Sequence, residues 1–94
     1  MSKEAYQQKA EAKIEEQQAK LNQARAKAKG ASADAKIEIE KGISELEKKL
    51  DAAKAKLAEI GDAAEDAWEG MAKTLENAWD EISGGIKGVL SRFK

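Results

Sequence analysis

Residues 43–60 read ISELEKKLDAAKAKLAEI, and their apolar side chains recur at steps of three and four. An α-helix has 3.6 residues per turn, so side chains with this spacing form a stripe along one face. Such a stripe is expected to pack against another helix. The same spacing continues almost to the last residue and passes through Ile43, Leu46, Leu50, Ala53, Leu57, Ile60, Ala64, Ala67 and Met71.

The composition favours long helices throughout. Ala, Lys, Glu, Leu and Arg supply 55 of the 94 residues, and these are the residue types typical of coiled coils. Aromatic residues make up only 4% of the chain and charged residues 37%, so a thick globular core is not expected. The sequence therefore predicts an all-α fold of antiparallel coiled-coil helices, forming a single helical domain over residues 1–94.

Charge and residue types exclude several classes of function. Seventeen basic and eighteen acidic side chains nearly cancel, whereas nucleic-acid-binding proteins usually carry a clear basic excess. The chain has no histidine and no cysteine, and its carboxylates lack the pairing typical of metal sites or acid–base catalysis. We therefore expect no enzyme activity, catalytic residue, metal, cofactor, small-molecule substrate or nucleic-acid partner.

Two places look like helix boundaries. Gly30 follows a lysine-rich turn and precedes Ser32, a good N-cap, while Asp62 after Gly61 can cap a helix in which Glu65 reaches back. These signals predict helices over about 3–29, 33–60 and 62–92. The alternative is a helix that runs straight through either glycine, so that the last two segments form one long helix in a hairpin.

The first segment repeats at seven residues, but its repeat is mostly alanine. One column holds Ile14, Leu21, Ala28 and Ala35, and the other holds Ala10, Gln17, Ala24 and Ala31. With so few large side chains, this segment gains little free energy from packing, so it is predicted to need a partner helix. The helix-packing interface is predicted to consist of Ile14, Leu21, Ile39, Ile43, Leu46, Leu50, Leu57 and Ile60.

The third segment is the most apolar and holds both tryptophans, eleven residues apart. These rings either cover the thin alanine seam of the neighbouring helices, or form a free face for self-association or for an anionic membrane. Because the first segment is so poor in large side chains, we expect a homo-oligomer. The predicted self-association or membrane face is Trp68, Met71, Leu75, Trp79, Ile82, Ile86, Val89, Leu90 and Phe93.

Two Ala-Trp-acidic motifs, at residues 67–69 and 78–80, are followed by a terminal Ser-Arg-Phe at 91–93. With AKIEIEK at 35–41 and LAEI at 57–60, they resemble a family of small bacterial coiled-coil proteins described as stress-response proteins. The resemblance spans nearly the whole chain. It implies a soluble bacterial helical protein associated with stress, without a known reaction, cofactor or catalytic residue.

The predicted function is that of a non-enzymatic structural or stress-associated coiled-coil protein, which acts by self-assembly or protein interaction through its apolar helix face. The alternative is a peripheral membrane-binding protein that uses the amphipathic residues 62–94. The first residues lack the apolar run of a secretion signal, and no stretch approaches twenty apolar residues. The expected location is therefore the cytoplasm.

Overall fold

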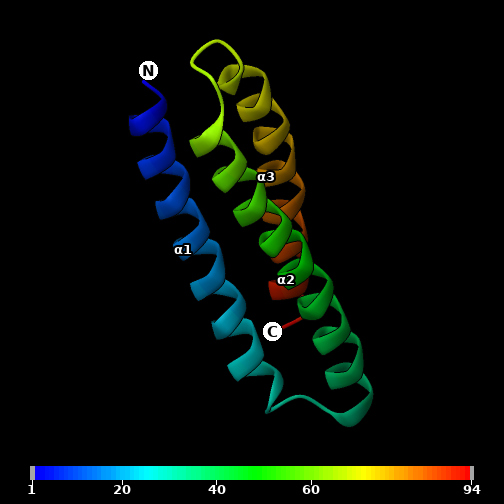
Figure 1. The fold of residues 1–94 in the computed structure, drawn as a ribbon. Coiled ribbons are helices and arrows are strands. Elements are labelled where there is room, and N and C mark those ends of the chain that lie inside the picture. The colour runs from blue at the N-terminus through cyan, green and yellow to red at the C-terminus, as the bar shows by residue number, and fades with distance from the viewer. Residues whose placement is uncertain (1, 94) are drawn as a thin grey trace.

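The computed structural model describes residues 2–93, which form three α-helices and no strand (Figure 1). Helix α1 spans Lys3–Ala28, α2 spans Ala33–Asp62 and α3 spans Trp68–Leu90. Together they make a rod of 50 × 16 × 16 Å. The all-α prediction is confirmed.

The helices lie side by side along the rod, and each turns back on the one before it (Figure 1). Arg25 of α1 pairs with Glu47 of α2, and Lys49 of α2 pairs with Glu81 of α3. The α1–α2 turn and the end of α3 therefore share one end of the rod, and the N-terminus and the α2–α3 loop share the other.

The core is the meeting line of three rows of buried side chains. We call the row that each helix contributes its seam. Seam residues follow one another at steps of three or four, the spacing that keeps a row facing its neighbours in a coiled coil. The α1 seam is Tyr6, Ala10, Ile14, Gln17, Leu21, Ala24 and Ala28. The α2 seam is Ile39, Ile43, Leu46, Leu50, Ala53, Leu57 and Ile60. The α3 seam is Trp68, Ala72, Leu75, Trp79, Ile82, Ile86 and Val89.

The break predicted at Gly30 is present. Helix α1 ends at Ala28, and α2 begins after Ser32, whose hydroxyl accepts a hydrogen bond from the Ala35 N–H at 3.4 Å. This is the N-cap that the serine was expected to provide.

The break predicted at Gly61 is present but lies further along the chain, and the alternative of one long helix is wrong. The capping role expected for Asp62 and Glu65 is also wrong. Helix α2 continues to Asp62, and α3 begins only at Trp68, where no side chain caps the helix. Lys3 explains the extension, since its Nζ donates to the carbonyls of Gly61 (3.2 Å) and Ala63 (3.0 Å). Carbonyls at a helix end lack partners within the helix, so this distant lysine stabilises the two additional residues of α2.

The loop between α2 and α3 also interrupts the stripe predicted to run without a gap from Ile43 to Met71. The α2 seam ends at Ile60 and the α3 seam starts at Trp68. Ala64 and Ala67 lie between them and are exposed, and Met71 is half-buried at the edge of the core.

Candidate interaction surfaces

The eight residues predicted as the helix-packing interface all lie in the core. Each has an exposed fraction of 9% or less, and Leu21, Ile43, Leu50 and Ile60 are fully buried. They belong to α1 and α2, so the structure adds a third partner, the seam of α3, to the interface predicted from the sequence.

The predicted self-association or membrane face points inward rather than outward. Met71, Leu90 and Phe93 are partly buried at the edge of the core. The other six residues are buried in the seam of α3: Trp68, Leu75, Trp79, Ile82, Ile86 and Val89. The free face expected from the sequence is therefore absent from the closed bundle. The burial of Trp68 and Trp79 agrees with the alternative expectation, in which these rings lie among the neighbouring helices.

Tyr6 fastens the first turns of α1 to α3. Its hydroxyl lies 3.1 Å from Glu76 Oε1 and 3.3 Å from the Ala72 carbonyl oxygen, and donates to these acceptors. Its ring packs against that of Trp68, with 5.7 Å between the ring centroids. Burial, together with the hydrogen bond to Glu76, raises the pKa of Tyr6 to about 12. Sequence reasoning missed this contact, although a lone tyrosine in an alanine seam was a signal for it.

Gln17 is the buried polar residue in the middle of the α1 seam. Its Nε2 donates to Ser83 Oγ of α3 over 3.5 Å, a long hydrogen bond. Its Oε1 is buried and has no hydrogen-bond partner. A buried polar atom without a partner typically costs about 1–3 kcal/mol, so Gln17 weakens the attachment of α1.

Ion pairs link neighbouring helices along the surface of the rod. Arg25 donates two hydrogen bonds to the Glu47 carboxylate, which holds the pKa of Glu47 below its usual range and raises that of Arg25. The Arg92 guanidinium lies 2.9 Å from a Glu38 oxygen. Exposed pairs of this kind contribute little to the free energy of unfolding, about 0–1 kcal/mol each. Their main effect is on how the helices align with one another.

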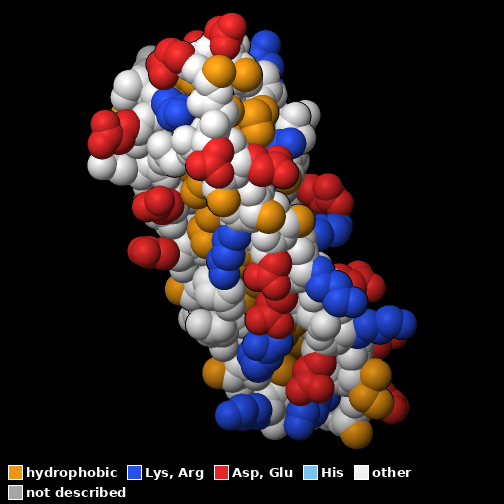
Figure 2. Space-filling view, in the orientation of Figure 1, with side chains coloured by type: hydrophobic (Ala, Val, Ile, Leu, Met, Phe, Trp, Pro, Cys, Tyr) orange, Lys and Arg blue, Asp and Glu red, His pale blue; other side chains and the backbone are white. Residues whose placement is uncertain are grey.

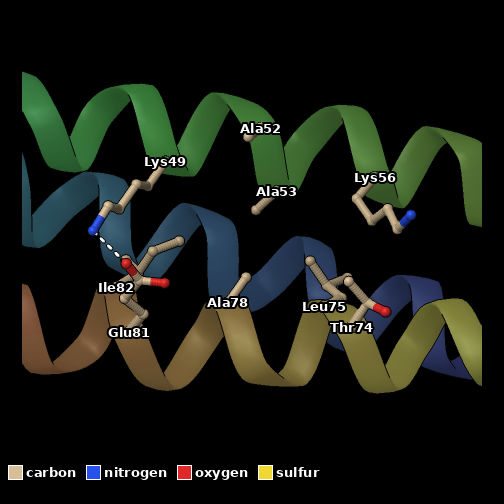
Figure 3. A pocket seen from close by; sticks show the side chains of 9 residues that line it. All are labelled: Lys49, Ala52, Ala53, Lys56, Thr74, Leu75, Ala78, Glu81 and Ile82. Atoms are coloured by element: carbon tan, nitrogen blue, oxygen red, sulfur yellow. Dashed lines mark hydrogen bonds and ion pairs between the residues drawn. The ribbon is translucent and has the colours of Figure 1, made fainter.

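A shallow groove of about 330 Å³ runs between α2 and α3, on the side away from α1 (Figure 3). The groove exists because three of its lining residues, Ala52, Ala53 and Ala78, are too small to fill the space. These alanines also make its floor apolar. The Lys49–Glu81 ion pair crosses one end of it. The groove therefore suits apolar side chains of another helix better than a polar substrate.

One end of the rod is basic. Residues 24–41 and 85–93, which meet around the α1–α2 turn, carry seven basic and three acidic side chains. Basic side chains gather in the lower half of the visible face (Figure 2). Ile37 lies in the first turns of α2 and, with an exposed fraction of 65%, is the one exposed large apolar residue among residues 2–93. This end therefore joins positive charge to an apolar side chain.

The described part of the chain offers neither a cluster of metal ligands nor a membrane-spanning helix. Within residues 2–93, no three acidic, histidine or cysteine side chains lie close enough together to hold a metal ion. Over the same residues, no helix is both long enough and apolar enough to cross a bilayer.

Comparison of the chain with models of known protein families, with curated proteins and with solved structures finds no match. The resemblance to bacterial stress-response proteins therefore stays a prediction. What the protein does has to be argued from its surfaces and its core.

Proposed function

We propose that the protein is a non-enzymatic coiled-coil interaction protein in which α1 is an exchangeable helix. In the closed rod, α1 covers the seams of α2 and α3. When α1 leaves, these seams accept an amphipathic helix from a partner, which includes a second copy of this chain. The stress-associated role in bacteria and the cytoplasmic location expected from the sequence belong to the same proposal.

The observation that carries this proposal is the composition of the α1 seam. Three of its seven residues are alanine and a fourth is Gln17, whose Oε1 lacks a partner. The α2 and α3 seams contain one alanine each, and the rest are large apolar residues. Burying a large apolar side chain contributes roughly 1.5–3 kcal/mol, so α1 gains least from packing and is the helix that opens at the lowest free energy.

Opening would expose the kind of surface that binds helices. The α2 and α3 seams present rows of Ile, Leu and Trp at steps of three and four, which is the arrangement that an amphipathic helix recognises in a groove. Binding is then an exchange of one helix for another. A partner helix with larger seam residues than α1 would bind these seams more tightly than α1 does.

A labelled peptide of residues 3–28 provides the test. The peptide should bind the intact protein by replacing its own α1, and binding should be saturable by fluorescence anisotropy. A control peptide with Leu21→Glu should not bind, because a charge would enter the core.

A locked protein separates exchange from binding elsewhere on the surface. Arg25→Cys and Glu47→Cys place two thiols where α1 and α2 are already paired, and a short bis-maleimide can join them within one chain. The locked protein should lose peptide binding. Equal binding by the locked and unlocked proteins would rule out exchange of α1.

The basic end favours a second candidate function, docking on an anionic membrane surface. Each lysine or arginine near such a surface contributes about 1 kcal/mol, and Ile37 would add apolar contact with the bilayer. The membrane face predicted from Trp68 and Trp79 is buried in the closed rod, so docking would use this end or require opening. Co-sedimentation with vesicles containing phosphatidylserine, compared with neutral vesicles, tests it. Ile37→Asp should abolish binding through the basic end.

A further inference from the structure

We propose that the α1–α2 turn is a hinge and that two copies of this chain exchange α1 through it. In the exchanged state, α1 and α2 form one continuous helix, and α1 of each copy lies on the α2 and α3 seams of the other. This inference rests on the proposed function and names the second copy as the partner helix.

The turn departs from helical geometry over very few residues. The backbone N–H groups of Lys29, Gly30 and Ala31 each donate to the carbonyl three residues before, so the helical winding of α1 persists almost to Ser32. Ser32 has φ −62°, a helical value, and ψ 159°, an extended one. Rotation of this ψ angle to a helical value is therefore one change needed to join the two helices.

Glycine is not required at the turn. Gly30 does not have a positive φ, and neither does any other residue in the described range 2–93. A methyl group added at Gly30 would find the Lys27 carbonyl oxygen at 3.7 Å, an ordinary contact. The turn thus lacks the left-handed residue that commonly terminates a helix.

The seams of α1 and α2 stay on one face when the helices are joined. The last seam residue of α1 is Ala28 and the first of α2 is Ile39. They are eleven residues apart, which is three helical turns at 3.67 residues per turn. Between them the alanine columns continue through Ala31 and Ala35, which are half-buried and exposed in the hairpin. The same sequence therefore suits both a hairpin and a straight helix.

The exchanged dimer preserves the contacts of the monomer. Tyr6, Gln17 and Arg25 would meet the same partners as before, now on the other chain. The new element is the joined helix over residues 3–62, about 90 Å long at 1.5 Å per residue. The dimer would be nearly twice as long as the 50 Å monomer.

Two sets of variants test the hinge in opposite directions. Gly30→Ala with Ser32→Ala removes a helix-weakening residue and the N-cap of α2, and should lower the dimer dissociation constant about tenfold or more. Ala33→Pro should hold the protein as a monomer, because Ala33 is the first residue of α2 and proline there keeps Ser32 extended. Light scattering after size exclusion distinguishes 10.2 kDa from twice that mass, and circular dichroism confirms that each variant is folded.

Cysteine cross-linking distinguishes exchange from ordinary association. Chains carrying Arg25→Cys are mixed with chains carrying Glu47→Cys, unfolded and refolded together, and treated with a short bis-maleimide. Cross-links between the two populations are expected in the Gly30→Ala/Ser32→Ala background and absent in the Ala33→Pro background.

A folded Gly30→Ala/Ser32→Ala protein that remains monomeric would overturn the hinge, and so would a dimer without cross-links between chains. Peptide exchange in the wild-type protein is read separately. If the peptide of residues 3–28 still binds, only the exchange between copies fails. If it does not bind either, the proposed function fails as well.

Discussion

The seams of α1 and α3 share a pattern but differ in bulk. Each has seven buried residues at steps of three and four, and each faces the other two helices. The α3 seam contains two tryptophans and one alanine, while that of α1 contains three alanines and a glutamine. Spacing decides where each helix lies, and side-chain volume decides how firmly it is held. Substitutions in the two seams measure this difference.

The largest effect is expected from Trp79→Ala in the α3 seam. Trp79 is 4% exposed, and truncating a buried tryptophan typically lowers the free energy of unfolding by about 3–5 kcal/mol. Ile14→Ala in the α1 seam should cost about 2 kcal/mol, the lower end for such a truncation, because the thin seam leaves room to relax. Urea denaturation measures both. If both variants lose the same free energy of unfolding, side-chain volume does not decide how firmly each helix is held.

A paired glycine experiment measures how closely α2 and α3 approach. A methyl group at Gly85 would overlap the side chain of Leu46, whereas one at Gly84 would meet nothing within 4 Å. Gly84→Ala should raise the free energy of unfolding by about 1 kcal/mol through helix propensity. Gly85→Ala gains the same but also overpacks the core, which costs about 1–3 kcal/mol. If urea denaturation finds the two variants equally stable, the close approach is not real.

Tyr6→Phe tests the polar fastening of α1. Loss of the hydroxyl should lower the free energy of unfolding by about 1 kcal/mol, since the ring contact with Trp68 remains. The pKa of Tyr6 is about 12 in the folded protein and 10.0 for a free phenol. Its stabilising effect is thus complete below pH 10 and is lost as the pH rises from 10 towards 12.

The alkaline titration has a built-in control. The chain has one tyrosine, so phenolate absorbance near 295 nm reports Tyr6 alone. Thermal melts should show a smaller difference in melting temperature between wild type and Tyr6→Phe at pH 11 than at pH 9. A phenol that titrates near 10 while the protein is still folded would contradict the buried hydrogen bonds.

The smallest effect, and the only gain in the α1 seam, is expected from Gln17→Met. The change keeps the length of the side chain and removes the Oε1 atom that lacks a partner, so the free energy of unfolding should rise by about 0.5–1 kcal/mol. Hydrogen exchange should then slow in α1 more than in α2 or α3. Unchanged protection of α1 would show that Gln17 does not set its opening.

Much of the helical architecture could be predicted from the sequence because spacing alone carries it. The steps of three and four placed the seam residues of α2, and Gly30 with Ser32 marked the first turn. The second boundary was placed too early because the end of α2 depends on Lys3, which lies 58 residues from Gly61 in the chain. The local sequence suggested that Asp62 caps the next helix, but with Lys3 hydrogen-bonded to nearby carbonyls Asp62 lies within α2 instead.

The orientation of the α3 face was missed for a related reason. The sequence shows how much apolar surface each helix has, but not which helix covers it. Counting the alanines of α1 suggested a surplus on α3 that needed a second molecule. In the structure both tryptophans are buried within one chain, and Trp68 packs on the ring of Tyr6. The apolar surface of α3 is therefore covered by the other two helices of the same chain.

The position of Gly85 against Leu46 has a consequence for synthesis on the ribosome. Because of this close packing we expect the α2–α3 hairpin to form first during folding, yet α3 is the last of the three helices to be translated. At roughly 5–20 residues per second, the first helix waits several seconds for its docking site. Its alanines expose little apolar surface during that delay, so α1 itself offers few side chains to chaperones or to aggregation.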